Sequence, residues 1–277
     1  MTTTVITGTT NGIGLVTARE LARNQHRLLL LCRNLKAAET VATDIKKETS
    51  NSDIIPILCD LSSLESVHNA VAKIKQEVDH IDMLINNAGI ISPEKEFSAD
   101  GFELTIAVNH LGPFLLTRSL ESFLVGGQVI NLASKAHLFC KASELFAEQD
   151  FLSPERYGAF KTYARSKLTN ILFSFFYAKQ HTTKIASHCL HPGSIGTNII
   201  PTHNLFTRGI NKIWKAIGPS PIRGAKTTLH LALSPRDSLE SGLYWENAKP
   251  TDASSAANDQ TLQKICWDHS NRLVGLV

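Results

Sequence analysis

The amino-acid sequence predicts an α/β fold in a single domain, with a doubly wound parallel sheet of about seven strands and helices on both faces. Two observations lead to this fold class. Short apolar segments alternate along the chain with longer amphipathic segments, an order that requires right-handed crossovers between parallel strands. The apolar segments are also continuous, as in strands that are buried on both faces of a sheet.

The predicted strands are rich in leucine and β-branched residues, whereas the predicted helices repeat apolar residues every three or four positions. Strands are expected at Thr4–Thr7, Arg27–Cys32, Asp53–Cys59, Asp82–Asn86, Gly127–Leu132, Lys184–His191 and Gly242–Trp245. Helices are expected at Gly14–Asn24, Lys36–Ser50, Leu64–Val78, Phe102–Phe123, Arg156–Gln180, Gly224–Leu233 and Asp259–Arg272. The small polar patch Ala253–Ala257 is expected to be a loop.

Size and composition favour a single domain that spans residues 1–277. The chain has 277 residues, of which 43% are hydrophobic and 19% charged. A disordered chain would be charge-rich and poor in apolar side chains, and a chain of this length can bury a sizeable core. The net charge of +3 is too small to predict nucleic acid or an anionic membrane as the main partner.

A substrate-loop flap is expected at residues 195–221, where glycines and prolines interrupt the strand and helix patterns. Its apolar side chains either wall an apolar pocket or pack as ordinary helices. They are Leu205, Phe206, Ile210, Ile213, Trp214 and Ile217.

Cysteine usage predicts a reducing, cytoplasmic environment. The five cysteines are widely spaced and form no Cys-x-x-Cys pair, so free thiols are expected instead of a disulfide framework. The sequence shows no targeting segment and no stretch of about 20 apolar residues, so no membrane anchor is expected. Since His110, His137, His188 and His191 lack metal-ligand spacing, no metal site is predicted.

A glycine-rich turn follows the first predicted strand and opens the first predicted helix. Gly8, Gly12 and Gly14 are spaced Gly-x-x-x-Gly-x-Gly. Glycines let the backbone turn sharply and approach a pyrophosphate, whose charge the helix N-terminus favours. A tight turn without a ligand is the alternative. We therefore expect the dinucleotide to contact Gly8, Thr10, Asn11, Gly12, Ile13 and Gly14.

Two tyrosine–lysine pairs have the i,i+4 spacing that acid–base chemistry would need. They are Tyr157 with Lys161 and Tyr163 with Lys167. A tyrosine has an ordinary pKa of about 10, and a lysine ammonium one helical turn away can lower it towards 7. The spacing alone does not distinguish the two pairs.

Several motifs in order resemble the short-chain dehydrogenase/reductase family over nearly the whole chain. They are the glycine turn, Asn86-Asn87-Ala88-Gly89, Asn109, Ser134, Tyr163-Ala164-Arg165-Ser166-Lys167 and His191-Pro192-Gly193 through Thr197. The resemblance selects the Tyr163 pair over the Tyr157 pair, which would then line the substrate mouth or pack at the surface. It implies that Tyr163 is the acid/base, that Lys167 lowers its pKa, that Ser134 orients a carbonyl and that Asn109 supports a proton relay.

The same resemblance implies further contacts to a nicotinamide cofactor. The residues are Asp60, Leu61, Asn87, Ala88, Gly89, Tyr163, Lys167, Pro192, Gly193, Ile195 and Thr197. Asp60 would touch the adenine; a cap for the helix that begins near Leu64 is the alternative role, and both can hold together. After the second strand, Arg33 stands where the family places an acidic residue in NAD-dependent members. A guanidinium suits a 2′-phosphate, which favours NADP over NAD unless Arg33 is merely solvated.

The resemblance is closest to the retinol dehydrogenase and WW-domain oxidoreductase branch. The segments that carry it are Leu31-Cys32-Arg33-Asn34, Val108-Asn109-His110-Leu111-Gly112-Pro113-Phe114 and Ser134-Lys135-Ala136-His137. It implies an oxidoreductase that transfers a hydride between NADP(H) and a lipophilic carbonyl or alcohol. A homodimer or homotetramer through Phe102–Phe123 and Arg156–Gln180 is expected. Two alternatives stay open: a catalytically silent cofactor-binding regulator, and an epimerase or dehydratase on the same fold.

Overall fold

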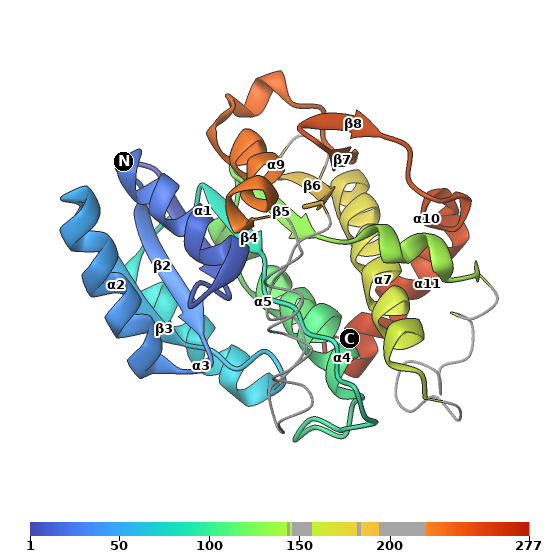
Figure 1. Cartoon of the computed structure of the whole chain (residues 1–277). Coiled ribbons are helices and arrows are strands. Elements are labelled where there is room, and N and C mark those ends of the chain that lie inside the picture. Colours follow the sequence, from blue (N-terminus) through green and yellow to red (C-terminus); the bar gives the residue numbers. More distant parts are fainter. Residues whose placement is uncertain (143–144, 146–156, 182–183, 194–219, 277) are drawn as a thin grey trace.

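The computed structural model describes residues 1–142, 145, 157–181, 184–193 and 220–276 (Figure 1). Eight strands of this part form one sheet in the order β3-β2-β1-β4-β5-β6-β7-β8. They are β1 (Thr3–Thr7), β2 (Arg27–Cys32), β3 (Ile54–Leu58), β4 (Met83–Asn86), β5 (Gln128–Leu132), β6 (Ala186–His191), β7 (Tyr244–Glu246) and β8 (Lys249–Thr251). Strands β1 to β7 pair in parallel and β8 runs antiparallel to β7. The strand order turns at β1, as in a doubly wound fold, which confirms the predicted fold class.

All seven predicted strands occur, with ends that move by at most two residues, whereas the eighth was not predicted. Strand β8 is exposed along its length, so its residues carry no apolar signal. The segment Ala253–Ala257, expected to be a loop, instead contributes to a short helix, α10 (Ser255–Asn258). This helix forms because the Ser254 hydroxyl accepts a hydrogen bond from the Ala257 amide and so caps its first turn.

Helices cover both faces of the sheet (Figure 1). They are α1 (Gly12–Arg23), α2 (Leu35–Thr49), α3 (Leu64–Glu77), α4 (Leu104–Ile106), α5 (Gly112–Ser119), α7 (Ala159–Gln180), α9 (Pro221–Leu233), α10 and α11 (Gln260–Leu273). On one face, α1, α2 and α9 pack on Leu28 and Leu30 of β2 and on their neighbours. On the other, α3, α5, α7 and α11 pack with Leu29 and Leu31. Successive side chains of a strand point to opposite faces, so two cores explain the continuous apolar runs.

The predicted helix Phe102–Phe123 is interrupted in the structure. It divides into α4, a π-helical segment η1 (Ala107–Leu111), α5 and a 3₁₀ turn η2 (Glu121–Phe123). The helical run is nevertheless continuous from 104 to 119, so the predicted helix occurs with a π-helical turn in its middle and shorter ends. Pro113 at the start of α5 has no amide hydrogen to donate into the preceding turn, and a π-helical turn there accommodates one extra residue. Asn109, one of the predicted site residues, and its neighbour His110 lie in η1.

The flap expected at residues 195–221 lies outside the described residues, apart from Ser220 and Pro221, which begin α9. Ile195 and Thr197 lie outside the described residues as well. Of the helices that the structure describes, none combines the length and apolar character needed to cross a bilayer. The same part of the chain holds no group of three or more histidine, cysteine or acidic side chains arranged for a metal ion.

Candidate active site

The predicted site residues gather where the central strands end. The glycine turn follows β1, Asn87 follows β4, Ser134 follows β5, and Pro192 follows β6. Because parallel strands β1, β4, β5 and β6 are neighbours in the sheet, their carboxyl ends share one edge. This edge, at the strand-order reversal beside β1, is where ligands bind in doubly wound folds.

The glycine turn is tightly packed against the segment after β4. Gly8 and Gly12 have φ angles of 73° and 59°, which glycine adopts without strain. A Cβ atom on Gly14 would collide with the Gly8 carbonyl oxygen and the Asn87 side-chain nitrogen. Helix α1 begins at Gly12 with no acidic residue in its first turn. The glycine turn therefore presents the positive N-terminal end of α1, and no carboxylate in the first turn of this helix offsets that charge.

Asn87 fastens the two turns together. Its Nδ2 donates to the Thr7 and Gly8 carbonyls over 2.8 and 3.1 Å. The Thr7 hydroxyl in turn accepts from the backbone amides of Asn87 and Ala88, both at 3.0 Å. These bonds fix the Asn87-Ala88-Gly89 segment against β1, so its shape is set before any ligand arrives.

Lys167 projects from α7 into the protein beside Gly89. Its Nζ donates to the Leu132 carbonyl over 2.9 Å, and the residue is 4% exposed. Burial lowers the pKa of Lys167 to about 8, because desolvation penalises the ammonium. A Cβ on Gly89 would stand 3.3 Å from both this Nζ and Asn109 Oδ1. A side chain at this position would therefore crowd the lysine, and the glycine does not.

Tyr163 lies one turn before Lys167 on α7, with its ring 5.5 Å from the Lys167 Nζ. Burial raises the pKa of Tyr163 to about 12, and a hydrogen bond with the Ser134 side chain opposes this shift. The lowering of this pKa by Lys167 stays a prediction for the complex with the cofactor, whereas in the protein alone desolvation of the phenolate raises the pKa. At neutral pH Tyr163 is a neutral phenol, which is the form that can give a proton.

Asn109 joins α7 to the segment after β4. Its Oδ1 accepts from the Ile90 amide over 2.7 Å, and its Nδ2 donates to the Ile90 carbonyl and to Ser166 Oγ. The Ser166 hydroxyl then donates to the Tyr163 carbonyl over 2.7 Å. Asn109 thus holds the backbone on which Tyr163 stands.

The second tyrosine pair lacks the geometry that the spacing suggested. Helix α7 begins at Ala159, so Tyr157 precedes the helix and does not share a helical face with Lys161. The Tyr157 hydroxyl donates to the Ser92 carbonyl over 2.5 Å. Tyr157 therefore ties the chain before α7 to the segment after β4, and Tyr163 is the tyrosine at the strand ends.

His137 is a functional candidate that the sequence analysis did not assign. It lies in the 3₁₀ segment η3 (Lys135–Phe139), where its Nδ1 donates to the Ser134 carbonyl over 2.7 Å. Its Nε2 accepts from the Ser254 amide over 3.2 Å. Both ring nitrogens are used by a neutral imidazole, and burial lowers the pKa of His137. Only the Ser-x-x-His spacing, one 3₁₀ turn, hinted at this contact.

The adenosine end of the expected site is more open. Arg33 is exposed after β2, and Asn34 caps α2 by accepting from the Ala37 amide. Asp60 accepts from the Ser62 amide and hydroxyl, at 2.9 and 2.7 Å. The cap of α3 is Ser63, not Asp60, so the helix-cap explanation of Asp60 was wrong. Leu61, 7% exposed, follows it.

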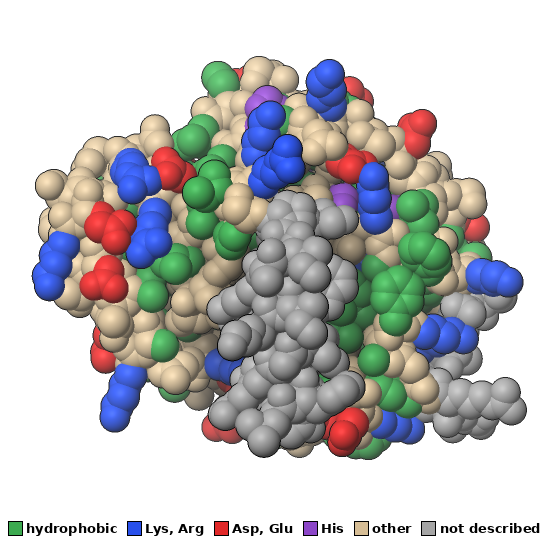
Figure 2. All heavy atoms as spheres, in the orientation of Figure 1, with side chains coloured by type: hydrophobic (Ala, Val, Ile, Leu, Met, Phe, Trp, Pro, Cys, Tyr) green, Lys and Arg blue, Asp and Glu red, His purple; other side chains and the backbone are tan. Residues whose placement is uncertain are grey.

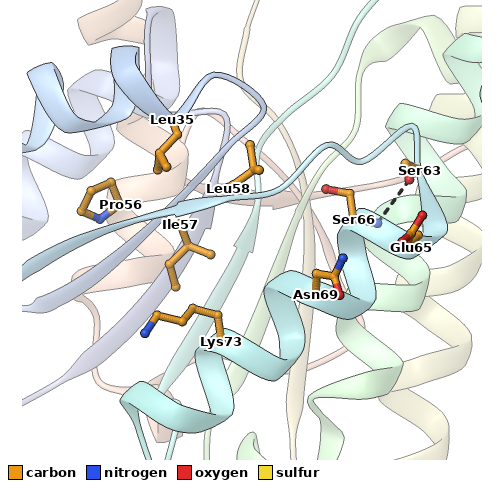
Figure 3. A pocket seen from close by; sticks show the side chains of 9 residues that line it. All are labelled: Leu35, Pro56, Ile57, Leu58, Ser63, Glu65, Ser66, Asn69 and Lys73. Carbon is orange, nitrogen blue, oxygen red and sulfur yellow. Dashed lines mark hydrogen bonds between the residues drawn. The ribbon is translucent and has the colours of Figure 1, made fainter.

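A surface groove of about 530 Å³ lies apart from these residues, between α2, β3 and α3 (Figure 3). Its lining includes Leu35, Leu58 and Lys73 and none of the predicted site residues. The chemistry-bearing residues therefore do not lie in this groove.

The comparisons with known proteins agree with this geometry. The sequence model described as short chain dehydrogenase matches residues 2–143. Retinol dehydrogenase 12 of Mus musculus is 35% identical over 98% of this chain and 86% of its own length. Retinol dehydrogenase 11 of Homo sapiens is 33% identical over 98% of this chain and 85% of its own length. The chain belongs to the short-chain dehydrogenase family, and it is an oxidoreductase of that family.

Solved structures support the same fold. A protein of Mycobacterium paratuberculosis superimposes with a TM-score of 0.78 and 28% identity, over 99% of this chain and 94% of the other. A short chain dehydrogenase from Escherichia coli CFT073, complexed with NADPH, gives a TM-score of 0.66 at 20% identity, over 88% of this chain and 95% of the other. Together with the sequence match, they place the chain among single-domain α/β dehydrogenases that bind a nicotinamide cofactor.

Replacing Tyr163 by phenylalanine removes the phenol proton and leaves the ring in place. We expect Tyr163→Phe to lower kcat about a thousandfold, the range of a lost general acid, with little change in NADPH affinity. Turnover and fluorescence titration with NADPH measure the two effects. Tyr157→Phe is the matched control, and a dead control beside an active Tyr163→Phe enzyme contradicts the assignment.

The bond from His137 to Ser134 is tested by two amides of different reach. Asparagine can place a donor near the position of Nδ1, whereas glutamine reaches towards Nε2. We expect His137→Gln to lower kcat/KM about tenfold, or about 1.4 kcal/mol, and His137→Asn to lose less. The Kd for NADPH should stay unchanged in both. Equal kcat/KM values in the two variants and the parent would remove His137 from any positioning role.

Proposed function

We propose that the protein is an NADP(H)-dependent oxidoreductase that interconverts a carbonyl and an alcohol, with a lipophilic substrate. The observation that supports this proposal is the arrangement of Ser134, Tyr163 and Lys167 at the strand ends. The Ser134 side chain bonds the Tyr163 hydroxyl, and Lys167 lies beneath the Tyr163 ring. A hydroxyl, a neutral phenol and a buried amine fit the reduction of a carbonyl.

The residues present fit a dinucleotide. Lys167 Nζ has three hydrogens, of which the bond to the Leu132 carbonyl uses one, and Gly89 adds no side chain beside it. The glycine turn and the start of α1 would hold the phosphates, Asp60 and Leu61 the adenine, and Lys167 the nicotinamide ribose. Pro192 and Gly193, with Ile195 and Thr197 of the residues not described, would hold the nicotinamide amide. When bound, the cofactor supplies or accepts the hydride.

Each side chain of the site then has one task in reduction. Ser134 donates to the carbonyl oxygen and orients it, while Tyr163 gives that oxygen a proton as negative charge develops there. Lys167, protonated below a pKa of about 8, stabilises the phenolate that remains. Asn109 fixes the distance between α7 and the segment after β4. It also supports the relay that returns a proton to Tyr163 after each reduction. In the alcohol-oxidising direction the same groups act in reverse.

A lipophilic substrate is supported by exposed apolar residues close to the site. Leu138, Phe139 and Phe160 are 57%, 69% and 53% exposed, and the two phenylalanine rings meet edge to face at 5.4 Å. Hydrophobic side chains gather over η3 and the start of α7 in Figure 2. A contiguous exposed apolar patch often marks a binding site for an apolar ligand. The named relatives are retinol dehydrogenases, which fits the same class.

We also propose a reducing compartment, the cytoplasm, for the protein. All five cysteines are buried, and Cys32, Cys59, Cys189 and Cys266 are free thiols. Burial raises the pKa of Cys59, Cys189 and Cys266 to about 12, which keeps these thiols unreactive. Buried, protonated thiols that lack disulfide partners suit a reducing environment.

Cofactor choice depends on Arg33 in this proposal. We expect Arg33→Asp to lower the kcat/KM for NADPH by about ten- to a hundredfold, since a hydrogen-bonded charge contributes about 1.5–3 kcal/mol, and to leave NADH less affected. Initial rates with both cofactors measure the ratio. Lys36→Asp, an equal charge change at a nearby exposed position, is the control. An unchanged NADPH/NADH ratio in Arg33→Asp would assign the arginine to solvent.

The function itself is tested by NADPH oxidation with aldehydes and ketones graded by chain length. We expect kcat/KM to rise with apolar chain length, because each buried methylene contributes about 0.8 kcal/mol. Cofactor binding with no turnover on any carbonyl or alcohol would favour the silent regulator. Substrate conversion without net NADPH loss would favour an epimerase or dehydratase.

A further inference from the structure

Helix α7 has almost no exposed surface. Every residue from Thr162 to Phe175 is buried, and a helix that is buried all round lies in a core instead of at a surface. In α5, the residues from Gly112 to Thr117 are also buried. The family resemblance of the sequence predicts that these two helices meet a second subunit. In the structure another part of the same chain covers them.

Part of that cover is α11, which lies along α7 (Figure 1). The segment η3 and helix α10 also contact α7, and α3 contacts α5. Its Trp267 ring meets Phe114 of α5 at 5.4 Å and Phe176 of α7 at 5.1 Å between ring centroids. It stacks on Phe173 at 6.1 Å. One aromatic side chain thus bridges both helices, and clusters of this kind dominate the energetics of interfaces.

Polar bonds fix α11 at several points along its length. Lys179 donates to Gln263 over 2.9 Å, and Arg118 donates to Asn271 over 3.0 Å. The Arg118 guanidinium also stands 4.4 Å from the centroid of the Trp267 ring, within cation–π range. Each end of the helix is therefore held, and its register against α5 and α7 is defined.

A third bond connects α11 to the site. The Ser270 hydroxyl donates to the Cys266 carbonyl over 2.7 Å, so the His110 Nε2 hydrogen is donated to Ser270 Oγ, also over 2.7 Å. Burial lowers the pKa of His110 to about 4, which keeps its ring neutral. His110 is the neighbour of Asn109 in η1, so α11 holds the segment that carries Asn109.

The outer side of α11 has the opposite character. Thr261, Lys264, Asp268 and Arg272 are exposed, and their spacing of three and four residues places them on one stripe of the helix. Lys264 and Asp268 form an ion pair at 2.5 Å. A charged, solvated stripe suits water better than the apolar centre of a subunit interface.

The sheet edges also discourage pairing with another copy. The edge strand β3 contains Pro56, and the opposite edge strand β8 contains Lys249 and Pro250. A proline removes a backbone donor, and lysine and proline are the residues that keep edge strands from associating.

We propose that α11 occupies, within one chain, the place of a second subunit on α5 and α7. The face formed by these helices is closed to self-association, and the protein does not form the homodimer or homotetramer expected through it. This inference concerns packing alone and does not depend on the proposed oxidoreductase activity.

Light scattering and hydrogen–deuterium exchange on the full chain test the proposal together. At low and at high micromolar concentration we expect the mass of one chain, 30.4 kDa, and equal amide exchange in α5 and α7. An oligomer whose α5 and α7 amides gain protection with concentration would overturn the proposal. An oligomer with unchanged exchange there uses another surface and supports the closed face.

A pair of variants tests α11 as the cover. Trp267→Ala should speed amide exchange at least severalfold in α5 and α7, whereas Lys264→Ala, on the outer stripe, should not. Unchanged exchange in a folded Trp267→Ala protein would show that α11 does not cover the face. If Trp267→Ala fails to fold, the concentration series on the parent protein decides the question.

Discussion

The site depends on one costly arrangement, a lysine ammonium that is removed from water. An unpaired buried charge is strongly unfavourable. The surroundings of Lys167 must therefore supply hydrogen-bond acceptors and leave space for the amine. The Leu132 carbonyl at the end of β5 accepts one of its hydrogens. Gly89 leaves room beside the amine, where a Cβ atom would make a tight contact of 3.3 Å with Nζ. The position of α7, the shape of the segment after β4 and the end of β5 all follow from the need to accommodate this single group.

The groups around the reactive side chains act mostly through backbone. Asn109 holds Ile90, Ser166 bonds the Tyr163 carbonyl, and His137 bonds the Ser134 carbonyl. Each of these contacts leaves the hydroxyl of Tyr163 or Ser134 available for chemistry. Preorganisation of this kind lets a site keep its geometry while protons move. Burial raises the pKa of Tyr163. The position of the Tyr163 ring does not depend on its charge, because the backbone of α7 holds the ring in place.

Periodic and motif-bearing parts of the chain could be predicted from sequence, and parts defined by tertiary contacts could not. The seven parallel strands are apolar on both faces, so their signal is strong, and the resemblance selected Tyr163 over Tyr157. The structure supplies the reason, because Tyr157 precedes α7. Strand β8 was not predicted because it is exposed and contains Pro250. The π-helical turn at Asn109, the two bonds of His137 and the cap of α3 by Ser63 depend on neighbours that no local pattern reveals. The packing of α11 on α5 and α7 through Trp267 is likewise a long-range contact.

A cover that belongs to the same chain cannot be lost by dilution. A partner subunit leaves when the protein concentration falls below the dissociation constant, whereas α11 is tethered and keeps a fixed effective concentration near its docking face. The support that α11 gives to η1 through His110 and Ser270 is therefore the same in a single copy of the protein as in a concentrated solution. In the arrangement that we propose, the C-terminal helix is as much a part of the catalytic unit as the sheet.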